Sequence, residues 1–340
     1  MELSGRLKQI YDNIEKTHPK LGKLAILEII CDTANKALLV IGTSGTGKSA
    51  AMKYVADTVS RQKILIDSVT VSGLKYTQKL FNGANMTILV DDVSKGGTEY
   101  SQIQTIATLG ELAYSGFIKK YTLQIAIEIE NFRGAVIMNG QPLILKRVLS
   151  APEFETDIRD KVIRYYHLPR PVNPTIGYPK NGIQHGYNIN DVDIPEKVYQ
   201  SEYYSKALEN FLYEFTKGRA VLHLDNMIKA VAVIQGRDKA LVEDVKVIEY
   251  LSRNFRIETE IFYKKDLEGA RILDPNVIPL LSIIATYKTR RIEDIMMEFG
   301  VKKSRAYEIV QENPNIAQFK DKILIPTEET IELLKSIGEW

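Results

Sequence analysis

Cysteine and histidine are scarce in this chain of 340 residues, which contains one cysteine, Cys31, and four histidines. A single thiol excludes an internal disulfide framework, and the scattered histidines offer no metal-ligand spacing. A chain without disulfides suits a reducing compartment. We therefore expect a cytoplasmic protein with no disulfide partner.

Long apolar runs and an excess of charge of one sign are also missing. No apolar run reaches the roughly 18 residues needed to span a bilayer, and the N-terminal stretch MELSGRLKQIYDNIEK is charged throughout. We therefore expect neither export nor a membrane partner. The 45 Lys and Arg residues nearly balance the 43 Asp and Glu residues, so any basic surface for nucleic acid must be local.

Short apolar runs alternate with longer periodic segments between Lys36 and Leu168. The runs are ALLVI, KILIDSVTV, TILVDD, AVIMN and VIRYYHL. Continuous apolar runs separated by helices are typical of a parallel sheet that is covered on both faces. We predict an α/β core over residues 1–170 with a parallel five-stranded sheet.

Changes in composition mark the units that follow this core. Residues 171–201 are rich in Pro, Gly and Asn, which predicts a linker or a surface excursion. Residues 202–265 carry helical periodicity and predict a small helical unit. Residues 275–340 show a separate pattern of helices followed by two short strands, which predicts a further domain.

The stretch IGTSGTGKSA, residues 41–50, joins the apolar run KALLV to the helical-looking AMKYVADTV. It matches the phosphate-loop pattern G-x-x-x-x-G-K-[ST] at every required position. Glycines in such a loop let backbone N–H groups surround a β-phosphate, and the helix N-terminus adds a positive dipole. The predicted nucleotide contacts are Gly42, Thr43, Ser44, Gly45, Thr46, Gly47, Lys48 and Ser49.

Lys48 and Ser49 have the two most specific roles in this loop. Lys48 would neutralise charge on the β- and γ-phosphates, and the Ser49 hydroxyl would ligate Mg²⁺. ATP and Mg²⁺ are therefore the predicted cofactors. A chance glycine turn is the alternative, and the strand before the loop and the helix after it argue against that alternative.

Two acids close the apolar run in NMTILVDDV. Asp91 and Asp92 therefore lie at the carboxyl end of a buried strand, the edge at which open parallel sheets bind ligands. Asp91 would hold Mg²⁺, directly or through water, and Asp92 would orient and polarise the attacking water. A solvated strand end without function is the alternative.

The order of phosphate loop, acidic strand end, Asn-ended strand and Arg-bearing segment resembles the AAA+ ATPases. The resemblance implies that Asn139, in GAVIMNGQP, is the sensor-one residue that helps to position the water; a plain Asn-Gly turn is the alternative. It also implies an arginine finger, just before the fifth strand, for a neighbouring subunit's nucleotide. We choose Arg159, with a surface ion pair to its flanking acids as the alternative. The rivals are Lys161, Arg164 and, further upstream, Arg147.

The acidic strand end departs from the family pattern. AAA+ proteins usually carry Asp-Glu where this chain has Asp-Asp. Asp92 is one methylene shorter than Glu, which favours slow hydrolysis and leaves nucleotide binding intact. By the same resemblance, the residues beside the adenine ring are His18, Pro19 and Leu21.

Two flanking segments, THPKLGKLAILEII and LDNMIKAVAVIQGRDKALVEDVKVIEYL, are similar to those around the ATPase core of minichromosome-maintenance helicases. The resemblance implies that residues 202–265 form a small helical lid and that Arg219 is its sensor-two arginine. Leu222 stands where the family's pattern places that arginine. A solvated helix position is the alternative for Arg219.

The C-terminal segment RRIEDIMMEFGVKKSRAYEIVQEN has two apolar helical faces separated by Gly300, which is the helix-turn-helix signature. Basic residues at the start of the second helix are where bases and phosphates would be contacted. In IAQFKDKILIP, two short strands resemble the wing of a winged-helix domain. A winged helix that contacts only protein is the alternative. The candidate DNA contacts are Lys302, Lys303, Arg305 and Lys322.

Within the core, FIKKYTLQIAIEIENF alternates apolar and polar residues and predicts a hairpin or an extra strand. In several AAA+ motors an insertion at this place points a basic tip into the central pore. Lys119 and Lys120 would there contact DNA phosphates. An exposed strand edge protected by lysines is the alternative.

These features predict an AAA+ ATPase with a C-terminal winged helix that binds DNA and assembles as a homo-oligomeric ring, with a hexamer expected. The leading function is a minichromosome-maintenance-like helicase or translocase that couples ATP hydrolysis to movement on DNA during replication. The first alternative is an ATP-gated DNA-binding switch, such as a replication initiator, helicase loader or transposition regulator. The second is a signal-transduction ATPase whose winged helix contacts protein.

Overall fold

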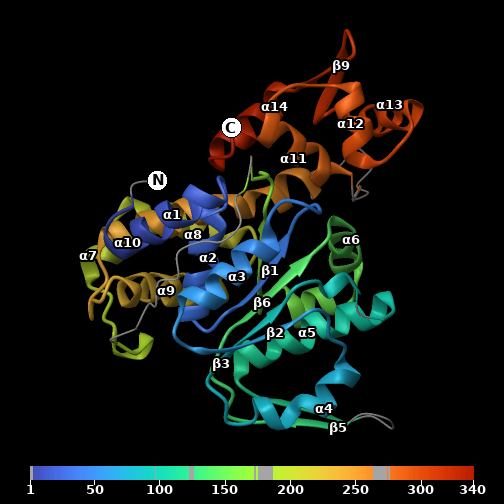
Figure 1. Ribbon diagram of the computed structural model, residues 1–340. Helices are drawn as coiled ribbons and strands as arrows, with labels where there is room; N and C mark the ends of the chain where they lie inside the picture. Colours follow the sequence, from blue (N-terminus) through green and yellow to red (C-terminus); the bar gives the residue numbers. More distant parts are fainter. Residues whose placement is uncertain are drawn as a thin grey trace.

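The computed structural model describes residues 3–95, 97–121, 126–171, 174, 187–262, 274 and 276–340. Its central strands are β1 (Ala37–Ile41), β2 (Gln62–Ile66), β3 (Met86–Val90), β6 (Val136–Gly140) and β7 (Val162–Tyr166). They form one parallel sheet in the order β2-β3-β6-β1-β7 (Figure 1). The predicted α/β class and parallel five-stranded sheet are therefore confirmed.

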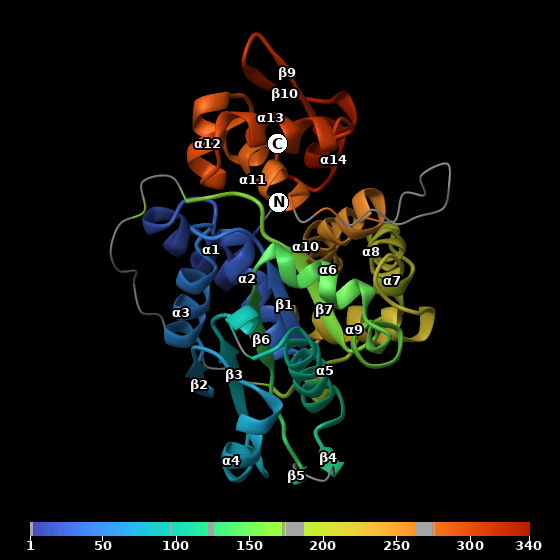
Figure 2. The ribbon, with the colours of Figure 1, turned by 90° about the vertical axis from the view of Figure 1, so that its right-hand side faces the viewer.

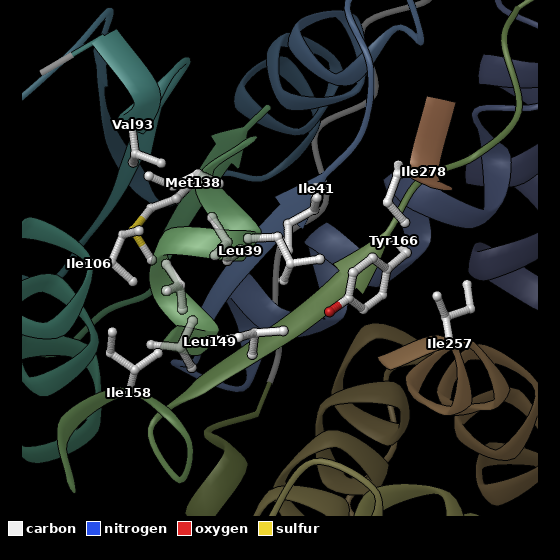
Figure 3. Packing of buried hydrophobic residues seen from close by; sticks show 14 of the residues in the cluster. Leu39, Ile41, Val93, Ile106, Met138, Leu149, Ile158, Tyr166, Ile257 and Ile278 are labelled. Atoms are coloured by element: carbon white, nitrogen blue, oxygen red, sulfur yellow. The ribbon is translucent and has the colours of Figure 1, made fainter. Parts of the chain in front are cut away.

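Side chains of β1 alternate between two apolar layers, and every residue of this strand is buried. Leu38 and Val40 belong to one layer. Leu39 and Ile41 belong to the other (Figure 3). This division follows from the two-residue period of a strand. Helices cover both layers, so the strand must be apolar throughout. The first layer holds α1 (Gly5–Thr17), α2 (Gly22–Thr33) and α3 (Lys48–Thr58), and the second holds α4 (Val71–Phe81), α5 (Glu99–Ser115) and α6 (Pro142–Ser150).

A group of helices from residue 196 to 252 extends the first layer. Phe211, Leu224 and Ile248 share its core with Leu27 of α2. The last three of these helices lie within residues 202–265, for which we predicted a helical unit, whereas the first lies within the predicted linker 171–201. Residues 263–265 of that segment, and residues 172–173 and 175–186 of the predicted linker 171–201, lie outside the described residues. The helices are α7 (Glu196–Tyr199), α8 (Glu202–Leu212), α9 (Lys217–Ile234) and α10 (Val242–Ser252).

The C-terminal unit lies over the edge at which the strands of the sheet end (Figures 1 and 2). Its helices are α11 (Val277–Tyr287), α12 (Ile292–Phe299), α13 (Lys303–Glu312) and α14 (Glu328–Ser336), and its strands are β8 (Arg290–Arg291), β9 (Ala317–Lys320) and β10 (Ile323–Pro326). β10 pairs antiparallel with both other strands. Gly300 ends α12 in the left-handed region, with φ of 62°, as its glycine predicts. Ile278 packs in one cluster with Ile41 and Tyr166 (Figure 3).

An antiparallel hairpin lies at the other end of the molecule (Figure 2). It consists of β4 (Ile118–Tyr121) and β5 (Ala126–Ile129), so the expected hairpin is present. Its tip, residues 122–125, lies outside the described residues. Among the helices of the described ranges, none combines the length and the apolar character needed to cross a bilayer.

Candidate phosphate-binding site

The glycine-rich loop, residues 42–47, joins β1 to α3 at the carboxyl edge of the sheet. The chain changes direction across the sheet here: the connection from β1 to β2 passes β6 and β3, whereas that from β6 to β7 passes β1. Ligands bind at such a switch point in open parallel sheets. The loop, the Asp pair and Asn139 therefore lie at one edge, as the sequence predicts.

At two positions of the loop, steric crowding requires glycine. A Cβ on Gly42 would lie 2.6 Å from the backbone oxygen of His167. Gly47 has φ of 87°, and a Cβ there would also lie 2.8 Å from Leu21 Cδ1. Only glycine fits both positions without displacing the backbone or its neighbours. Leu21 thus packs against the start of α3.

Lys48 is buried in the first turn of α3. Its Nζ donates hydrogen bonds to the backbone oxygens of Gly42, at 2.6 Å, and Thr43, at 2.8 Å. Burial lowers the pKa of Lys48 to about 8, although the negative charges of Asp92 and Asp91 oppose that shift. The ammonium group is therefore directed into the loop and lies within electrostatic range of both acids. Ser49 follows it and is half-buried.

Asp91 and Asn139 lie side by side at the ends of neighbouring strands. Val90 of β3 pairs with Met138 of β6 in parallel register, so the next residues, Asp91 and Asn139, are level with each other. Alternation places both on the face of α3, and Asn139 Nδ2 lies 3.9 Å from Met52 Sδ on that helix. Asp91 Oδ1 and Asn139 Oδ1 are buried without a hydrogen-bond partner in the described structure.

Asp92 lies just beyond the end of β3 and, of the two acids, has the larger electrostatic effect on Lys48. Its Oδ1 accepts a hydrogen bond from the backbone N–H of Ser94 at 2.8 Å, which fixes the turn after the strand. Its Oδ2 lies 3.9 Å from Lys95 Nζ. The Asp92 carboxylate is therefore fixed by the turn after the strand. Asp91, in contrast, has one oxygen, Oδ1, without a hydrogen-bond partner among the described residues.

The donor set fits Mg²⁺. Asp91 Oδ1 is a buried, unpartnered carboxylate oxygen, and Ser49 offers a hydroxyl in the first turn of α3. Magnesium prefers such oxygen ligands and keeps few of them from protein. In the part of the chain that the structure describes, no group of three or more His, Cys, Asp or Glu side chains could hold a metal alone. Phosphate oxygens would supply the remaining ligands.

Three residues that sequence reasoning missed also contact the loop. His167 Nε2 lies 2.9 Å from the backbone oxygen of Thr46, and burial lowers the pKa of this histidine to about 3. Because the ring is neutral and the carbonyl only accepts, Nε2 carries the proton and donates it. Arg170 Nη2 donates to Thr43 Oγ1 at 3.3 Å. Ser282 Oγ of α11 lies 3.5 Å from the same hydroxyl.

The structure does not bring Arg219 to the loop of its own chain. Its Cζ lies 4.6 Å from the ring centre of Tyr114, in the last turn of α5. α9 begins beside Asp160, which precedes β7, because Asp160 accepts hydrogen bonds from Thr216. Arg219 is therefore at the amino edge of the sheet, about one strand length, roughly 16 Å, from the carboxyl edge.

Arg159 also precedes β7 and lies at the amino edge. Its Nη1 donates to Glu155 Oε2 at 2.6 Å, and its side chain is 35% exposed. It does not approach the loop of its own chain, and its assignment to a neighbouring subunit's nucleotide stays a prediction. Lys161 instead pairs with Glu111 at 2.5 Å.

Two rivals of Arg159 occupy other environments. Arg164 is fully buried and pairs with Glu258 at 2.7 Å, so it cannot reach a second subunit and is excluded as the finger. Arg147 pairs with Glu99 at 2.7 Å and donates to Gln102 Oε1 at 2.8 Å.

The candidate DNA contacts lie at opposite ends of the molecule (Figure 2). In the hairpin, Lys119 pairs with Glu128 at 3.2 Å and Glu130 at 2.6 Å, and Lys120 Nζ donates to Gln104 Oε1 at 2.7 Å. The hairpin lysines are thus engaged within the chain.

At the C-terminal end, Lys302, Lys303 and Lys322 are exposed. Arg305 is exposed too, but it pairs with Glu308 and Glu312, each at 3.0 Å.

Comparisons with known proteins add little to this description. No family model matches the chain, and no curated protein is similar to it in sequence. Among solved structures, the chain is similar to a candidate ATPase from Cytophaga hutchinsonii ATCC 33406, with a TM-score of 0.45 and 18% identity. The likeness covers 72% of this chain and 84% of the other. We draw no functional conclusion from a likeness of this degree.

Proposed function

We propose that this protein is an AAA+ ATPase that binds ATP·Mg²⁺ at the loop 42–47 and hydrolyses it. The observation that carries the proposal is the convergence of Lys48, Asp91 and Asn139 on the same edge and face of the sheet. Asp91 and Asn139 present buried oxygens that have no partner among the described residues, and Lys48 is a buried cation that donates to backbone oxygens of the loop. Such an arrangement suits a polyphosphate with a bound cation.

In this proposal, different residues bind the phosphates, hold the magnesium ion and activate the water. Loop N–H groups and Lys48 bind the phosphates, and the dipole of α3 adds positive potential. Ser49 and Asp91 would hold Mg²⁺, which supplies charge neutralisation at the phosphates when it is bound. Asp92 takes a proton from the attacking water, and Asn139 orients that water through its amide.

We propose that the domains follow the boundaries expected from the sequence. Residues 1–170 are the ATPase core, residues 202–265 are the lid, and residues 275–340 are a winged-helix domain. Two helices around Gly300 and a hairpin paired to a third strand support the last assignment. A homo-oligomeric ring, expected to be a hexamer, would bring Arg159 of one copy to the nucleotide of the next.

We propose DNA as the macromolecular partner and a helicase or translocase as the activity. The exposed Lys302, Lys303 and Lys322 support a contact with phosphates at the C-terminal end. The ion pairs of Lys119 and Arg305 weaken the case for those two side chains.

A second candidate is an ATP-gated DNA-binding switch, and the environment of Asp92 favours it. This carboxylate is shorter than the usual Glu and is held by the Ser94 N–H group. Both features limit its reach toward a water molecule. Slow turnover with site-specific DNA binding would identify the switch.

The test is the steady-state ATPase rate with and without single- and double-stranded DNA, at low and moderate salt. Lys48→Ala should abolish the rate, whereas Lys53→Ala, an exposed lysine on the same helix, should leave it unchanged. A severalfold increase on DNA supports the motor. A slow rate that ignores DNA contradicts the motor, and no rate in the wild-type protein contradicts the ATPase.

A further inference from the structure

Arg170 places a second positive charge at the loop. It lies four residues beyond the end of β7, the neighbour of β1, and is half-buried. Its Nη2 donates to Thr43 Oγ1 at 3.3 Å. Its Nη1 lies 3.9 Å from the position that a Cβ on Gly45 would occupy, and apart from the residues next to Gly45 no other described residue comes within 4 Å of that position. The guanidinium therefore lies across the outer turn of the loop.

Helix α11 holds the segment that carries Arg170. Ser282 Oγ donates to the backbone oxygen of Leu168 at 2.6 Å, and the N–H group of Arg170 donates to Thr286 Oγ1 at 3.1 Å. Thr286 in turn donates to the backbone oxygen of Ser282 at 2.7 Å. Two side chains on consecutive turns of one helix thus fix the backbone on both sides of Pro169.

The electrostatics of the loop point to an anion with several charges. Burial lowers the pKa of both cations, and the positive charge of Arg170 is one of the causes for Lys48. Two cations that disfavour each other are stabilised together when an anion lies between them. A guanidinium also offers a planar pair of donors that matches two phosphate oxygens.

We propose that Arg170 is a nucleotide-binding residue that contacts phosphate oxygens in the same chain, and that Ser282 and Thr286 of α11 position it. The inference rests on the proposed nucleotide site. It assigns to the segment after β7 a role that the phosphate-loop motif does not cover. It also makes α11, which belongs to the C-terminal unit, part of the nucleotide site.

The test measures the equilibrium dissociation constant for ATP by calorimetry. Arg170→Met should weaken ATP binding by about tenfold or more, because a charge-assisted hydrogen bond is lost. The affinity of Arg170→Lys for ATP should lie between those of the wild type and Arg170→Met, because the positive charge stays and the planar pair of donors is lost. Arg133→Met is the matched control, since the exposed Arg133 precedes β6 by three residues, at the amino edge of the sheet. This variant should bind ATP as the wild type does.

Thr286→Val tests the positioning by α11, because it removes the hydroxyl but keeps the shape of the side chain. It should weaken binding less than Arg170→Met, and combined with Arg170→Met it should add nothing further. Unchanged binding by Arg170→Met, in a protein that unfolds at the wild-type temperature, overturns the inference and leaves the ATPase proposal intact. If the wild type and Lys48→Ala both fail to bind ATP, the proposed function and the inference are overturned together.

Discussion

At the scale of single residues, burial is the main cause of the shifted pKa values at the loop. It lowers the pKa of His167 to about 3, so this ring stays neutral and serves as a fixed donor to Thr46. It lowers the pKa of Lys48 to about 8, so the ammonium loses its proton about one pH unit above neutrality rather than in strongly basic solution. An anion bound beside Lys48 would restore the charged form.

Affinity for ATP should therefore fall as the pH rises. Phosphate binds the protonated form of Lys48, which predominates below a pKa of about 8 and is lost above it. Between pH 7 and pH 9 we expect about a tenfold weaker affinity, as one proton must be taken up on binding. Calorimetry at constant ionic strength measures this slope. Lys48→Arg, which keeps its proton, should show a flat profile; a wild-type profile equally flat would contradict the assignment.

Asp92→Asn should separate hydrolysis from binding. The amide keeps the acceptor for the Ser94 N–H group but cannot take a proton from water. We expect kcat to fall by about 100-fold with little change in the dissociation constant of ATP. Single-turnover hydrolysis and calorimetry measure the two quantities. Asp67→Asn, an exposed acid after β2 on the same edge, should change neither. Equal rates for Asp92→Asn and the wild type would exclude Asp92 as the base.

At the scale of elements, close packing of α5 against β7 depends on a glycine within the helix. A Cβ on Gly110 would lie 2.5 Å from Val162 Cγ2, and valine has little rotational freedom with which to move away. Gly218, in the first turn of α9, has no side chain or backbone of another described element within 4 Å of its Cβ position. Close packing of the helix therefore requires a glycine at position 110 but not at position 218.

Alanine at these two positions should change stability in opposite directions. Gly110→Ala should lower the free energy of unfolding by about 1–3 kcal/mol, because overpacking outweighs the gain in helix propensity. Gly218→Ala should raise it by about 0.5–1 kcal/mol, because only the propensity changes. Urea unfolding measures both. A stabilised Gly110→Ala protein would show that α5 can move away from β7 without cost.

Local sequence patterns predicted the elements well and the long-range contacts poorly. The loop 42–47 and the Asp pair could be placed because each is defined within a few residues of a strand. Arg170 and Ser282 meet the loop from more than 120 residues away, and no local pattern links them to it. One signal was present: a residue just after a strand of a parallel sheet lies at the carboxyl edge. Arg219 lies away from the loop of its own chain because the direction of α9 depends on packing.

At the scale of the whole molecule, the outermost strands of the sheet, β7 and β2, differ in how far other residues cover their outer sides. Asn254 closes the β7 edge by accepting from the Tyr166 N–H group at 2.8 Å and donating to the Tyr166 oxygen at 2.9 Å. The β2 edge is more exposed, and Leu65 is 46% accessible there. An unpaired strand edge can pair with a strand of another chain. Because Asn254 covers the outer side of β7 at Tyr166, strand pairing with a second chain is disfavoured there.

Buried charges join the covered edge to the helices that follow it. Arg164, at the centre of β7, is fully buried and binds Glu258 through two hydrogen bonds of 2.7 and 3.0 Å. Tyr166 donates to the same carboxylate at 2.7 Å, and Glu214 accepts from the Arg164 N–H group at 3.1 Å. Burial raises the pKa of Glu214 well above its usual range, whereas the charge of Arg164 opposes that shift.

Arg164→Met should therefore loosen the whole assembly of sheet and helices. It leaves the Glu258 carboxylate buried without its cation, and we expect a loss of about 3–5 kcal/mol in the free energy of unfolding. Adding Glu258→Gln should recover part of this loss, because the orphaned charge is removed as well. Arg256→Met breaks the partly exposed pair with Glu260 and a cation-π contact with Tyr213, and it should cost less than Arg164→Met does. Urea unfolding compares the three proteins, and equal losses for Arg164→Met and Arg256→Met would mean that the buried pair does not hold β7 to these helices.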